Sequence, residues 1–64
     1  MRSEYERVKR GAVSVELSGV KDDGYMVFVY VDGMLLCATY YPTKPTHEYL
    51  ADLANQWSND YEKR

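Results

Sequence analysis

The strongest hydrophobic pattern in the chain is the stretch VYVDGMLLCATYY at residues 29–41, which is apolar at nearly every position except its centre. The residues on both sides of the Asp32-Gly33 pair are β-branched, aromatic or aliphatic, a composition that favours strands. An Asp-Gly pair is preferred in two-residue type I′ turns. We therefore expect a hairpin of two strands, residues 25–31 and 34–41, which starts from a Val31–Met34 pair and continues without a register shift.

A further strand is predicted for residues 12–18, AVSVELS, in which apolar and polar residues alternate strictly. The turn-forming cluster GVKDDG at residues 19–24 separates this strand from the hairpin. An even-length loop, either Asp23-Gly24 alone or residues 21–24, places the apolar side chains of the strand beside Phe28, whereas an odd-length loop places them on the other face. We favour an even loop, because both even loops have good turn chemistry.

The residues from Thr46 to about Glu62 predict an amphipathic helix. Its apolar residues recur at helical spacing and form one stripe. They are Leu50, Leu53, Ala54, Trp57 and Tyr61. Pro45 fits near the start of this helix, with Thr43 or Thr46 as its N-terminal cap.

The N-terminal segment SEYERVKRG predicts a second, shorter helix. Ser3 and Glu6 have the spacing of a capping box, and Gly11 follows two basic residues as a C-terminal stop. Tyr5 and Val8 share one face at a spacing of three residues.

These elements give the order α–β–β–β–α and a single α+β domain over residues 1–64, in which a three-stranded antiparallel meander carries the longer helix on one face. With an even loop, one set of apolar side chains lies beneath that helix. This expected core consists of Val13, Val15, Leu17, Met26, Phe28, Tyr30, Leu35 and Cys37.

The other face of the predicted sheet is equally apolar, and one helix of about 17 residues cannot cover both faces. An exposed patch of that size is unusual for a monomer. We therefore expect a homodimer or a larger protein partner on this face. The expected partner face consists of Tyr25, Val27, Val29, Val31, Met34, Leu36 and Tyr40.

The composition is that of a globular protein, with 45% hydrophobic residues and a formal net charge of −2 over 64 residues. No segment approaches the roughly 20 apolar residues of a membrane span, and the N-terminus lacks the apolar core of a signal peptide. Cys37 is the only cysteine, so a disulfide within the chain is excluded. We expect a soluble, cytoplasmic protein without a membrane partner.

The sequence contains no arrangement of residues that indicates catalysis or a bound cofactor. Cys37 lies within a predicted strand and His47, the only histidine, opens the predicted helix, so the two are not expected to form a nucleophile–base pair. No zinc spacing, phosphate loop or nucleotide fingerprint is present. We expect a protein that is not an enzyme and holds no metal or cofactor.

Charge is distributed unevenly, with an acidic body between basic ends. The predicted C-terminal helix presents a possible acidic binding strip: Glu48, Asp52, Asp60 and Glu62. The basic residues of the N-terminal segment form the alternative site, for nucleic acid: Arg2, Arg7, Lys9 and Arg10.

The order α–β–β–β–α, with YMVFVYVDGMLLCATYY followed by a helix, resembles the layout of the double-stranded RNA-binding domain. The resemblance covers most of the chain and implies RNA binding as an alternative function. That family carries a basic cluster at the start of its last helix, whereas the matching stretch here, TKPTHEYLAD, has one lysine, one histidine and two acids. Nucleic acid is therefore the less favoured partner.

Small phage-encoded inhibitors, including some anti-CRISPR proteins, are similar to this chain in size and in combining a sheet with an acidic helix. This similarity implies an anti-defence inhibitor from a phage or mobile element. Together with the uncovered sheet face, it makes a non-catalytic protein-interaction module, homodimeric and presenting its acidic helix to a basic partner, the favoured function.

Overall fold

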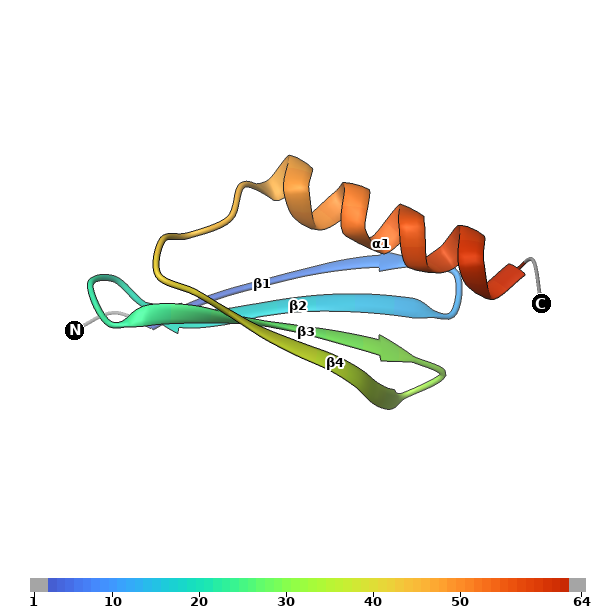
Figure 1. Ribbon diagram of the computed structural model, residues 1–64, viewed down its shortest axis with the longest axis horizontal. Helices are drawn as coiled ribbons and strands as arrows, with labels where there is room; N and C mark the ends of the chain where they lie inside the picture. The colour runs from blue at the N-terminus through green and yellow to red at the C-terminus, as the bar shows by residue number, and fades with distance from the viewer. Residues whose placement is uncertain (1–2, 63–64) are drawn as a thin grey trace.

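The computed structural model describes residues 3–62, except for the side chains of residues 61 and 62. Four strands are followed by one helix. They are β1 (Ser3–Arg10), β2 (Val13–Val20), β3 (Gly24–Val31), β4 (Met34–Tyr41) and α1 (His47–Glu62). The strands form one antiparallel sheet in chain order, and α1 lies across one of its faces (Figure 1). The fold is a small α+β fold, but the predicted order α–β–β–β–α is wrong.

The predicted N-terminal helix is instead the strand β1, which pairs with β2 along its whole length. Gly11, expected to end a helix, begins a two-residue turn and has a positive φ of 59°. A helix of eight residues has little stability of its own. Pairing β1 with β2, in contrast, satisfies the backbone groups that β2 would otherwise expose along its edge. Because the first strand and the order differ, the resemblance to the double-stranded RNA-binding layout does not hold.

The loop between β2 and β3 has an odd length, contrary to the even loop that we favoured. Val20 pairs with Gly24 across the three residues 21–23. Asp22 adopts a φ of 76° in this turn, a left-handed conformation that Asp tolerates better than most residues. The odd loop exchanges the two faces of the hairpin, so that Leu17 pairs with Val27.

The turn at Asp32-Gly33 is confirmed, with positive φ angles at both residues and a Val31–Met34 pair across it. The expected Tyr30–Leu35 pair is also confirmed, but the register is wrong from Val29 onwards, because a bulge inserts Leu36 between the residues that pair with Tyr30 and Val29.

The hydrophobic core lies between α1 and the face of β2 and β3 that the odd loop selects. Of the residues whose side chains the structure describes, ten are buried: Val8, Val13, Val15, Leu17, Tyr25, Val27, Val29, Val31, Leu50 and Ala54. Of the expected core, Met26, Phe28 and Tyr30 are instead half-buried on the opposite face.

Helix α1 begins where the sequence predicts, and its cap is Thr46. The Thr46 Oγ1 accepts a hydrogen bond from the backbone N–H of Tyr49 at 3.1 Å. The helix buries Leu50 and Ala54, and it packs mainly on β1 and β2. The helix contacts β4 at the end of that strand, where Tyr41 meets Tyr49, and leaves the rest of β4 uncovered (Figure 1).

Gly19 has a packing role that predicts a large effect of a small substitution. It pairs with Tyr25, and a Cβ at position 19 would lie 2.4 Å from the Tyr25 ring and 2.6 Å from the carbonyl oxygen of Gly24. We expect Gly19→Ala to lower the free energy of unfolding by about 2 kcal/mol, because backbone must move to admit the methyl group. Urea denaturation measures this change.

The control is Ser18→Ala, an exposed neighbour on the same strand, which should stay within about 0.5 kcal/mol of the parent. Equal effects of the two substitutions would contradict the close packing of Tyr25 over Gly19.

Candidate interaction surface

The residues predicted to form a partner face are divided by the structure. Tyr25, Val27, Val29 and Val31 are buried in the core beneath α1, because the odd β2–β3 loop turns them toward the helix. These four residues therefore belong to the core and are not accessible to a partner, contrary to expectation. The remaining three members are exposed: Met34, Leu36 and Tyr40.

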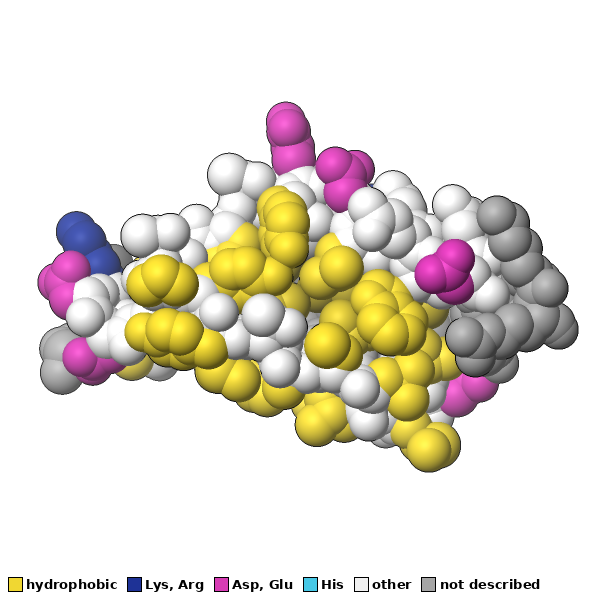
Figure 2. Space-filling view, in the orientation of Figure 1, with side chains coloured by type: hydrophobic (Ala, Val, Ile, Leu, Met, Phe, Trp, Pro, Cys, Tyr) yellow, Lys and Arg dark blue, Asp and Glu magenta, His cyan; other side chains and the backbone are white. Residues whose placement is uncertain are grey.

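Large exposed apolar side chains gather on β4. Four of them define what we call the β4 surface: Met34, Leu35, Leu36 and Tyr40, with exposed fractions of 67%, 52%, 51% and 58%. Leu35 was expected in the core, but it pairs with Tyr30, which the odd β2–β3 loop places on the face away from α1. Figure 2 shows hydrophobic side chains gathered along this side of the molecule, with acidic groups on the outer side of the helix.

The open face of the sheet, meaning the face away from α1, changes in character from one edge to the other. Its β3 side carries Met26, Phe28 and Tyr30, which continue the apolar character of the β4 surface. Its β1–β2 side is polar, with Arg7 opposite Glu16 and Lys9 opposite Ser14. The uncovered apolar area is therefore concentrated on one half of the sheet.

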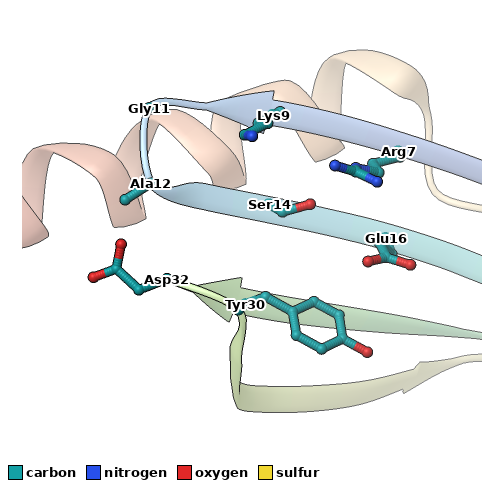
Figure 3. A pocket seen from close by; sticks show the side chains of 9 residues that line it. Arg7, Lys9, Gly11, Ala12, Ser14, Glu16, Tyr30 and Asp32 are labelled. Carbon is teal, nitrogen blue, oxygen red and sulfur yellow. The ribbon is translucent and has the colours of Figure 1, made fainter.

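A pocket of about 530 Å³ occupies the polar half of the open face. Figure 3 shows its lining side chains on three strands, with Arg7 and Lys9 on β1, Ser14 and Glu16 on β2 and Tyr30 on β3. The Ser14 hydroxyl oxygen is out of contact with solvent and has no hydrogen-bond partner among the described residues. The mixed charges of this lining do not select one class of ligand.

The basic residues proposed for nucleic acid do not form a single patch. Arg7 and Lys9 lie on the open face of β1, whereas strand alternation places Arg10 on the face that α1 covers. Arg2 lies outside the described residues. Glu16 also pairs with Arg7 across the two strands, so an acidic residue accompanies the basic ones on this part of the open face.

The acidic strip lies on the outer side of α1. Glu48, Asp52 and Asp60 are exposed, and no lysine or arginine occurs between the first and the last of them. The side chain of Glu62 is outside the described residues.

Two acidic residues of β1 hold the start of α1 against the sheet. Glu4 accepts hydrogen bonds from the Lys44 ammonium at 2.9 Å and from the Tyr25 hydroxyl at 2.7 Å. Glu6 is paired with His47, the first residue of the helix. These contacts have a fold-stabilising role that could not be foreseen while residues 3–10 were expected to be helical.

The hydrogen bonds of Glu4 change the acid–base behaviour of the residues that make them. The Lys44 ammonium, and then the Tyr25 hydroxyl, lower the pKa of Glu4 below its ordinary value. The Glu4 carboxylate in turn raises the pKa of Tyr25 and of Lys44. At the end of β4, the hydroxyl contact with Tyr49 at 2.6 Å raises the pKa of Tyr41 to about 12.

The two residues considered as a nucleophile–base pair have separate partners. The Cys37 thiol contacts the Thr39 hydroxyl at 3.7 Å, while His47 is held by Glu6. Among the side chains that the structure describes, no three metal-ligating groups of the His, Cys, Asp or Glu type lie together. The helix of the described chain is too short and too polar to cross a membrane.

The Glu4 contacts predict how stability depends on pH. Because the pKa of Glu4 is lowered in the folded chain, the stability that it contributes is present at neutral pH and is lost as the pH falls through that lowered pKa. We expect the parent to lose more stability than Glu4→Gln between about pH 6 and about pH 3. Urea denaturation across this range measures the difference. An Asp52→Asn control, on the outer side of α1, should follow the parent curve; parallel curves for parent and Glu4→Gln would contradict the assignment.

Removal of the unpartnered Ser14 hydroxyl is expected to stabilise the chain. Ser14→Ala should raise the free energy of unfolding by about 1 kcal/mol, since a buried hydroxyl without a partner carries a desolvation cost. Thermal and urea denaturation, with Ser18→Ala as the exposed control, measure the change. A loss of stability in Ser14→Ala would show that the hydroxyl is bonded in solution.

No protein-family model, curated protein or solved structure matches this chain. The interpretation of its function therefore depends on its own surfaces. Among these, the β4 surface is the one whose chemistry departs furthest from that of an ordinary solvated face.

Proposed function

We propose that the chain is a non-catalytic protein-interaction module that binds a protein through its β4 surface. The observation that carries this proposal is the exposure of four large apolar side chains on one strand, each more than half accessible to solvent. Clustered apolar surface of this kind is characteristic of protein-binding sites. A cytoplasmic site of action fits the single cysteine, Cys37, which is free.

The size of the β4 surface supports this role. With about 200 Å² for a fully exposed side chain of this kind, the four residues expose about 450 Å² together. This area is shared between the two faces of β4, because Met34 pairs with Val31 on the side of α1, whereas Leu35 and Tyr40 lie on the open face. The half-buried residues of the open face, Met26, Phe28 and Tyr30, extend the same apolar region. Its occupant is either a second copy of the chain or a larger protein.

The outer side of α1 supports a second candidate, in which the chain acts as a small anti-defence inhibitor of phage type. The exposed carboxylates Glu48, Asp52 and Asp60 lie on a helix face that the sheet does not cover. Such a face is complementary to a basic groove on a partner, and its binding would weaken as salt is added. The two surfaces are on different sides of the molecule, so each can be tested separately.

Site-specific photo-crosslinking in cells that express the chain tests the proposal. A photoreactive phenylalanine analogue replaces Tyr40 on β4, Tyr5 on β1 or Asn55 on the outer side of α1. Tyr5 is a matched control, because it is a tyrosine of similar exposure, 63%, on the opposite edge strand. We expect a discrete covalent adduct from position 40 and none from position 5.

The mass of the adduct identifies the occupant, either a second copy or a different protein. An adduct from position 55 without one from position 40 would transfer the interaction to the acidic side of α1 and contradict the β4 surface. Absence of an adduct at all three positions would overturn the proposed function.

A further inference from the structure

The two edges of the sheet have opposite chemistry. Five of the eight residues of β1 are charged, whereas β4, MLLCATYY, contains no charged residue, proline or glycine. Both are edge strands, because the sheet order is β1-β2-β3-β4. Charged side chains on an edge strand prevent it from pairing with another strand. The β1 edge is therefore protected against pairing, and the β4 edge lacks charged protection.

The only helix of the described chain, α1, also leaves the β4 edge free. Helix α1 packs on β1 and β2, and the side chains of the β4 surface are exposed. The bulge at Leu36 lies toward the Asp32-Gly33 turn, and from Cys37 to Tyr41 the strand pairs regularly with β3. These five residues present a regular row of backbone groups on their outer side, which is the template that another strand requires.

We infer that β4 pairs antiparallel with β4 of a second copy, across a two-fold axis normal to the sheet, to form a continuous eight-stranded sheet. This inference rests on the proposed function and identifies the protein bound at β4 as a second copy of the chain. Both copies of α1 then lie on the same face of the joined sheet. Because β4 is uncharged, the symmetric arrangement brings no like charges together.

Symmetry restricts the alignment of the two strands. Residues that face each other across an antiparallel pair lie on the same face of the sheet, so Cys37 faces a residue on the side that carries α1. The alignment that pairs all five regular residues places Thr39 opposite Thr39 and Cys37 opposite Tyr41 of the second copy, and shorter alignments place Cys37 opposite Thr39 or Cys37. Across these alignments, the Cα atoms of the two Cys37 residues are about 5 to 15 Å apart.

The contact between two single edge strands predicts a weak, reversible dimer. Pairing of the edges buries backbone groups and the flanks of the β4 side chains, while Leu35 and Tyr40 continue to project from the open face. The interface is therefore smaller than the roughly 1,200 Å² at the lower end of standard protein interfaces. The dimer is therefore expected to form in the micromolar range, without a requirement for any third component.

Sedimentation equilibrium of the purified chain tests the inference, from about 1 to about 200 µM protein. We expect a reversible shift from the 7.5 kDa monomer to twice that mass. Leu36→Lys should raise the dissociation constant at least about tenfold, because a charge on the edge opposes pairing. The control Tyr5→Lys, at an exposed site on β1, should change it by less than about twofold. Circular dichroism verifies that both variants are folded.

Cys37 provides a second readout in the unmodified chain. A bismaleimide whose spacer spans this range of distances should join two copies through Cys37 at concentrations at which the dimer forms, and Leu36→Lys should reduce the yield in proportion to its lost association. A dimer whose labelled Cys37 residues cannot be joined, or one that Tyr5→Lys disrupts and Leu36→Lys does not, would overturn the pairing of β4 with β4.

The outcomes separate this inference from the proposed function. A chain that stays monomeric up to about 200 µM, yet forms an adduct with a different protein from position 40, overturns the pairing and leaves the proposed function standing. A monomer without any adduct from position 40 overturns both.

Discussion

The packing of β2 against β3 is the interaction on which the rest of the structure depends. Val13, Val15 and Leu17 lie opposite Val31, Val29 and Val27, and all six are buried under α1. Full burial of each side chain contributes roughly 1.5–3 kcal/mol, a large share of the stability available to a 64-residue chain. This single apolar layer fixes the face on which the helix must pack. The polar residues of β2 are consequently turned to the open face.

The single helix produces an asymmetric molecule. Helix α1 packs on β1 and β2, where Glu4 and Glu6 hold its start through Lys44 and His47. On that side the sheet ends at β1, whose charged residues oppose pairing with another strand. The β4 side has neither a covering helix nor charged residues. The β1 edge of the sheet is therefore covered by α1 and protected by charged residues, whereas the β4 edge is uncovered and apolar. For this reason we place the proposed function on β4.

The features predicted correctly from the sequence are those with a strong local signal. The Asp32-Gly33 turn and the capped helix α1 each depend on a few neighbouring residues. Strand β1 was missed because its charged residues obscure the alternation and because Ser3, Glu6 and Gly11 imitate the ends of a helix. The odd loop depends on the left-handed conformation of Asp22, and the bulge at Leu36 lies in a segment with no polar alternation to reveal it. Exposure of Met34, Leu36 and Tyr40 was nevertheless anticipated; that of Leu35 was not.

Residue-resolved amide hydrogen exchange of the purified chain, at low and high protein concentration, distinguishes a paired β4 edge from a free one. In this fold the outward-facing amides of β1 and β4 both lack a partner strand within the chain. The account predicts that the outward amides of β4 become protected as the concentration rises, while those of β1 exchange rapidly throughout. Exchange that is equally fast on both edges at every concentration would contradict the pairing of β4 with a second copy, and protection confined to β1 would contradict the assignment of β4 as the binding edge.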